Sequence, residues 1–84
     1  YAAAMAKVRM ESLDGELLHE GTDARVVKLD RGAQLYFRLP DALAMDLAST
    51  RRQCVVIGQS RKFTATFSSL TNDGISVLDL VAAQ

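Results

Sequence analysis

The sequence contains very few of the residues that form cross-links or metal sites. Its 84 residues include one cysteine, Cys54, and one histidine, His19. A disulfide within the chain is therefore excluded, and so is structural zinc, which needs about four Cys or His ligands. A single cysteine fits a reducing compartment, so we expect a cytoplasmic protein.

Net charge and long apolar runs are also missing. Ten Lys and Arg balance ten Asp and Glu, so no overall field attracts a polyanion, although a neutral chain can still gather its cations on one face. No apolar run approaches the roughly 20 residues of a membrane span, and the N-terminus lacks the features of a signal peptide. The chain starts with Tyr1, so we expect a domain excised from a longer protein, with residues 1–5 as a linker or vector remnant.

The residues that are present predict one small β domain over 1–84. Nearly half are apolar and a quarter are charged, as in ordinary globular domains. Apolar and polar residues alternate with period two in residues 7–11, 34–39 and 62–68, which indicates strands with one wet face. The continuous apolar run 54–57 predicts a central strand covered on both faces. The predicted core consists of Val26, Leu35, Phe37, Leu39, Val55, Ile57, Phe63 and Phe67.

Turn residues separate these runs at the spacing of a small barrel. The predicted turns are Asp14-Gly15, Asp30-Arg31-Gly32, Gln59-Ser60-Arg61 and Asp73-Gly74. We therefore predict a mainly β fold, a small antiparallel β-barrel of six or seven strands with room for one short helix.

Two segments fit more than one structure. Residues 40–48 fit a helix that begins at Pro40, with Leu43 and Leu47 on one face, and equally a strand in which Leu43, Met45 and Leu47 alternate with polar or small residues. Residues 75–83 favour a strand after the Asp73-Gly74 turn over a helix capped by Asn72 or Asp73.

No combination of residues supports catalysis or a cofactor. A Cys54–His19 pair would be needed for nucleophilic chemistry, and nothing in the sequence brings these two residues together. Cys54 fits a buried apolar role instead. The acidic residues between Asp14 and Asp23 do not follow the spacing of a calcium loop. We therefore expect a protein that is not an enzyme and uses neither metal nor cofactor.

The candidate ligand or partner surface combines basic residues near turns with one strand that carries an aromatic and an arginine. Tyr36 and Arg38 share the polar face of that strand, where they suit a planar ligand or a protein partner, and Tyr36 fits equally a role in which it only covers the edge of the core. The basic residues would clasp a phosphate or carboxylate if the turns converge, or would simply keep exposed turns soluble. The full set is Lys28, Arg31, Tyr36, Arg38, Arg51, Arg52, Arg61 and Lys62.

From Ala24 onward the chain resembles a degenerate PilZ domain, the small bacterial β-barrel that senses cyclic di-GMP. Residues 25–33 look like the strand and turn that hold the family's D-x-S-x-x-G motif, residues 43–47 like the next strand, and residues 54–56 and 63–67 like the paired strands that follow. The Asp and Ser positions fall near Lys28 and Asp30, the spacing to Gly32 is one residue short, and the R-x-x-x-R entry is missing. The resemblance thus implies a signalling or regulatory module that has lost its nucleotide site and acts through another protein.

A second resemblance covers residues 27 to about 67. Arg38-Leu39-Pro40 followed by Leu43 and Leu47 looks like the R-[IL]-P strand end and short helix of the AbrB/MazE swapped-hairpin family. This resemblance implies a dimeric DNA-binding transcription factor or antitoxin. The two hypotheses differ at residues 40–48, which are a strand in the first and a helix in the second, and in the need for a dimer.

Overall fold

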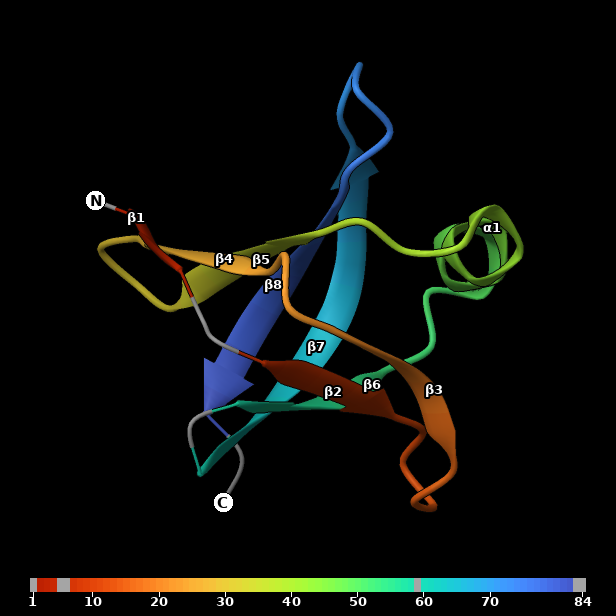
Figure 1. Ribbon diagram of the computed structural model, residues 1–84, viewed down its shortest axis with the longest axis horizontal. Coiled ribbons are helices and arrows are strands. Elements are labelled where there is room, and N and C mark those ends of the chain that lie inside the picture. The colour runs from red at the N-terminus through yellow and green to blue at the C-terminus, as the bar shows by residue number, and fades with distance from the viewer. Residues whose placement is uncertain (1, 5–6, 59, 83–84) are drawn as a thin grey trace.

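A computed structural model describes residues 2–4, 7–58 and 60–82, which form one antiparallel sheet and one helix (Figure 1). Seven strands have four or more residues, and the short strand β1 extends the sheet at one edge. The elements are β1 (Ala2–Ala4), β2 (Val8–Glu11), β3 (Leu17–Gly21), β4 (Arg25–Lys28), β5 (Ala33–Phe37), α1 (Asp41–Thr50), β6 (Cys54–Gly58), β7 (Arg61–Leu70) and β8 (Ser76–Ala82).

The sheet curls into a half-barrel with the strand order β1-β4-β5-β8-β7-β6-β2-β3. Every pairing is antiparallel, and α1 packs beside β7. The prediction of a mainly β fold with one short helix is confirmed. Residues 2–4, expected to be linker, pair with β4 as β1, and residues 1 and 5 lie outside the described part.

The predicted turns connect consecutive strands. Asp14-Gly15 lies between β2 and β3, and Asp30-Arg31-Gly32 lies between β4 and β5. Gly15 and Gly32 have φ values of 95° and 86°, a region that L side chains rarely adopt. Ser60 lies in the β6–β7 connection and Asp73-Gly74 in the β7–β8 connection, as predicted. Of the other two residues predicted for the first of these turns, Arg61 begins β7 and Gln59 lies outside the described residues.

Residues 40–48, which fitted two structures, lie within α1 and just before it. Pro40 is extended at the N-cap position, and its carbonyl accepts the first helical hydrogen bond from the Ala44 N–H at 2.9 Å. The helix buries Ala44 and Leu47 and ends at Arg51, which is in the left-handed conformation. The strand that the PilZ resemblance expected at 43–47 is therefore wrong. The strand favoured for 75–83 is confirmed as β8 over Ser76–Ala82. Ile75 precedes it, and residue 83 lies outside the described residues.

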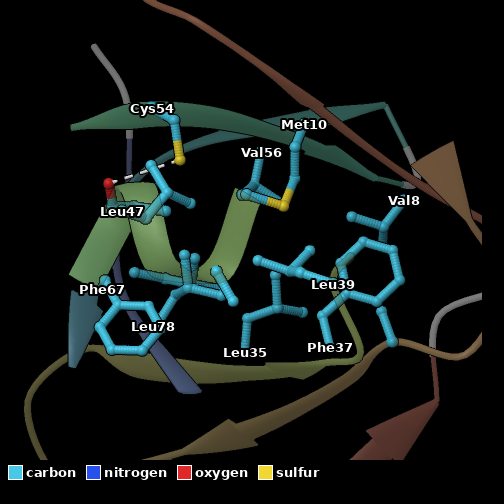
Figure 2. Close-up of a cluster of buried hydrophobic side chains, with 14 residues drawn as sticks. Val8, Met10, Leu35, Phe37, Leu39, Leu47, Cys54, Val56, Phe67 and Leu78 are labelled. Carbon is cyan, nitrogen blue, oxygen red and sulfur yellow. Dashed lines mark hydrogen bonds between the residues drawn. The ribbon is translucent and has the colours of Figure 1, made fainter. Parts of the chain in front are cut away.

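The core fills the concave side of the half-barrel (Figure 2). Leu35, Phe37, Leu39 and Phe67 are buried there, as predicted. Val26 and Phe63 are partly buried and pack against this core.

The predicted core positions on β6 are wrong. Cys54 and Val56 are buried, whereas Val55 and Ile57 lie on the opposite face and are only half-buried. Successive side chains of a strand point to opposite faces, and the core covers only one face of β6. The expectation of a strand covered on both faces is therefore wrong as well.

Candidate functional site

An open groove of about 490 Å³ lies over the outer face of β4 and β5, next to the β7–β8 turn. Arg25 and Val27 of β4 line it together with Tyr36 of β5. Its other lining residues come from loops: Asp23, Arg38, Asp73 and Ile75.

Strand alternation explains why a polar groove forms on this face. Leu35 and Phe37 of β5 point into the core, so Tyr36 between them points outward. Arg25 is the direct partner of Tyr36 in the β4–β5 register. Directly opposed side chains lie about 5 Å apart at Cβ, so Arg25 and Tyr36 form one surface.

The Arg38 side chain extends over the β7–β8 turn. A Cβ placed on Gly74 would lie 3.3 Å from Nη1 of Arg38, which puts the guanidinium directly against this turn. Asp73 and Ile75 flank Gly74, so the turn brings a carboxylate and an apolar side chain to the same groove.

The groove contains two guanidinium groups and two carboxylates that do not form ion pairs with one another. Within residues 2–4, 7–58 and 60–82, neither Arg25 nor Arg38 forms an ion pair, and the same holds for Asp23 and Asp73. Arginine can bind a carboxylate or phosphate through two parallel hydrogen bonds, and the phenol ring of Tyr36 offers a face for a planar group. The groove is therefore chemically suited to a ligand that carries an anionic group and an apolar or planar part.

The structure brings together two of the residues that the sequence predicted for a ligand surface, Tyr36 and Arg38. Sequence reasoning missed Arg25, Asp23 and Asp73 as their neighbours. Arg25 becomes a neighbour only through the β4–β5 register, and Asp73 only through the β5–β8 and β7–β8 pairings. The one sign of Arg25 in the sequence was its place in the run that leads into the predicted Asp30-Arg31-Gly32 turn.

Arg51 and Arg52 serve the end of the helix. Arg51 donates hydrogen bonds from Nε to the Ala48 carbonyl and from Nη1 to the Phe67 carbonyl, both at 3.2 Å. Arg52 pairs with Asp46 at 2.7 Å. Arg51 therefore ties the end of α1 to β7, and Arg52 ties the residues after the helix back to α1.

Of the remaining predicted residues, Arg61 and Lys62 lie at the other end of β6 from Arg51 and Arg52, whereas Lys28 ends β4 and Arg31 lies in the β4–β5 turn, away from β6. Arg61 pairs with Gly58, the last residue of β6, whereas Arg52 precedes the strand. Six residues of extended chain span about 20 Å. The proposed clasp of Arg51 and Arg52 with Arg61 and Lys62 is therefore not formed.

The side chains of Cys54 and His19 contact the protein interior, and within the described residues they form no hydrogen bond with each other, so their contacts are those of packing. Cys54 is buried and its thiol donates to the Ala65 carbonyl at 3.8 Å, the dashed line in Figure 2. Burial raises the pKa of this thiol. The His19 ring lies 5.1 Å from the Phe37 ring, centroid to centroid.

The acidic residues near the β2–β3 turn form local contacts. Ser12 donates a hydrogen bond to the carboxylate of Asp14, and this bond lowers the pKa of Asp14. Among the residues that the structure describes, no three His, Cys, Asp or Glu side chains are grouped so that they could hold a metal ion.

No model of a protein family, no curated protein and no solved structure matches this chain. In the described part of the chain, the helix is too short and too polar to cross a membrane.

Proposed function

We propose that this domain is a non-catalytic bacterial protein-interaction module of the regulatory kind. It resembles a PilZ domain without its nucleotide motif, although α1 stands where that resemblance expects a strand. The observation that carries the proposal is the groove in which Arg25, Tyr36 and Arg38 converge, with both guanidinium groups unpaired among the described residues. Tyr and Arg are the residue types that dominate the binding energy of protein interfaces. The groove is the contact site for a partner protein.

The lining of the groove indicates what the partner presents. An acidic side chain accepts hydrogen bonds from Arg25 and Arg38, and an aromatic or aliphatic side chain packs on Tyr36, Val27 and Ile75. Asp23 and Asp73 add two acceptors for a cation of the same partner segment. A segment with acidic, apolar and basic residues in succession complements all three features.

The short peptide Ac-Glu-Phe-Lys-NH2 tests this groove, with ¹H–¹⁵N NMR spectra recorded during the titration. We expect shifts in the signals of residues 23–27, 36–38 and 73–75. Replacing Glu by Gln in the peptide removes the carboxylate and weakens binding by about tenfold, because a charged hydrogen-bonded pair contributes about 1.5–3 kcal/mol.

A double variant provides the control on the protein side. Arg25→Ala with Arg38→Ala abolishes the shifts, whereas Arg9→Ala leaves them in place, because Arg9 is an exposed arginine of the same sheet that already pairs with Glu11 at 2.7 Å. If the peptide shifts other signals only, or if the double variant binds it unchanged, the groove is not the contact site.

A second candidate function rests on α1. A short helix follows Arg38-Leu39-Pro40, as the resemblance to swapped-hairpin DNA-binding dimers expects. Against this candidate, one chain completes its own core here, with residues from seven of its strands and α1 packed together, whereas a swapped hairpin needs its partner for a core. This candidate requires a dimer that binds duplex DNA.

A further inference from the structure

The groove at Arg25 and Arg38 has both of its carboxylates at one end. Arg25 pairs with Tyr36 in the antiparallel β4–β5 register, and Asp23 precedes Arg25 by two residues. Arg38 follows Tyr36 by two residues, and its guanidinium lies against the β7–β8 turn, which contains Asp73. Asp23, Arg38 and Asp73 therefore lie at the end of the groove that is formed by this turn, beyond the Arg25–Tyr36 pair.

The charges that line this groove cancel. It holds two guanidinium groups and two carboxylates, and its other lining residues among those described are uncharged, namely Val27, Tyr36 and Ile75. Elsewhere on the sheet a carboxylate forms an ion pair with a nearby arginine, as Glu11 does with Arg9 at 2.7 Å. Within the part of the chain that the structure describes, the two groove carboxylates form no ion pair, so they act on any charged group that enters the groove.

A groove without net charge favours a singly charged anion over a doubly charged one. A phosphate group carries about −1.5 to −2 charges at pH 7, whereas a side-chain carboxylate carries a single charge. The cost of removing an ion from water rises with the square of its charge, and an excess of positive charge at the site is needed to offset that cost. Phosphorylated segments are accordingly recognised by clusters of arginine, and a phosphate next to aspartate is repelled by the like charge. This groove has no such excess.

We infer that Asp23 and Asp73 make this groove selective for a carboxylate side chain over a phosphate, so that a partner segment is bound only while it is unphosphorylated at the groove. The inference rests on the proposed function and adds the chemical class of the partner's anion. The carboxylate of the segment binds to the two guanidinium groups, and a basic residue of the same segment binds to the two aspartates. Phosphorylation of the segment at this contact therefore releases it.

Two peptides that differ in their anionic residue test this selectivity. They are Ac-Glu-Phe-Lys-NH2 and the same peptide with phosphoserine in place of Glu, each titrated into ¹⁵N-labelled full chain at a pH of about 7. The signals of residues 23–27, 36–38 and 73–75 report both titrations. We expect the Glu peptide to bind about fivefold more tightly, a modest ratio because exposed charge contacts each contribute little.

A charge-neutralising variant shows whether the aspartates cause the selectivity. Asp23→Asn with Asp73→Asn keeps the size of both side chains and leaves two positive charges in the lining. This variant is expected to bind the phosphopeptide more tightly than the Glu peptide, which reverses the order of the parent chain. Asp30→Asn with Glu16→Gln is the matched control, because it removes two negative charges at exposed turn positions outside the groove and should keep the order of the parent.

The outcomes distinguish this inference from the proposed function. If the Glu peptide shifts the groove signals and the phosphopeptide binds equally well or more tightly, the selectivity is refuted and the groove remains a contact site. The selectivity is also refuted if the double Asn variant keeps the order of the parent, or if the control variant reverses it. If neither peptide shifts the groove signals, the inference and the proposed function are both overturned.

Discussion

At the scale of single residues, Phe37 is the side chain on which the core depends most. It is 1% exposed, its ring lies against that of His19, and a Cβ on Gly21 would lie only 3.2 Å from it. Phe67 closes the other side of the same cluster in Figure 2. A domain of this size has a thin core, so the loss of either ring leaves a cavity that few neighbours can fill.

Phe37→Ala and Phe67→Ala are each expected to lower the free energy of unfolding by about 3–5 kcal/mol. Urea and thermal denaturation followed by circular dichroism measure this. Val55→Ala, on the half-buried outer face of β6, serves as the control and is expected to cost about 1 kcal/mol. Melting of either Phe variant within a few degrees of the parent would contradict the assignment of the core.

Cys54 should be unreactive in the folded protein. The thiol is 1% exposed and burial raises its pKa, so very little of the nucleophilic thiolate forms at neutral pH. Iodoacetamide is expected to modify Cys54 far more slowly in the native chain than in urea, as mass spectrometry will record. Equal rates in the two conditions would mean that β6 does not cover the thiol.

At the scale of elements, the turns were the most predictable part of the fold. Asp-Gly and Asp-Arg-Gly between alternating runs specify tight hairpins through glycine's access to positive φ, and this requirement is local.

Alanine at two of these glycines should separate backbone strain from contact. Gly15→Ala meets no atom within 4 Å, so its expected cost of about 1–2 kcal/mol comes from the positive φ alone. Gly32→Ala has the same strain and also brings a Cβ to 3.3 Å from the Leu80 carbonyl oxygen, so it should cost more. Denaturation of the two variants compares them, and a less stable Gly15→Ala variant would contradict this order.

The sequence alone did not show whether residues 40–48 form a helix or a strand. It also did not show which side chains of β6 face the core. Leu43 and Leu47 fit a helix and a strand equally, and only burial of Ala44 and Leu47 under the tertiary fold selects the helix. In the run 54–57 every residue is apolar, so the pattern contains no sign of which face is inside. The structure puts Cys54 and Val56 inward because β6 pairs in register between β2 and β7.

At the scale of the whole molecule, the candidate surfaces depend on pairings between distant segments. Tyr36 and Arg38 were found from the sequence because they share one strand face. Their neighbours are distant in the sequence: Arg25 is 11 residues from Tyr36, and Asp73 is 35 residues from Arg38. Only the order of the strands in the sheet brings them close. For the same reason the eight predicted partner residues do not form one surface: they divide among the groove, the end of α1, the β4–β5 turn and the start of β7.

The solution mass, measured by light scattering with and without a DNA duplex of about 15 base pairs, tests most directly whether this chain works as a self-contained interaction module. A chain that completes its own core is expected at the monomer mass of 9.1 kDa, unchanged by the duplex. A tight dimer whose mass rises with DNA would contradict this account and establish the swapped-hairpin DNA-binding alternative in its place.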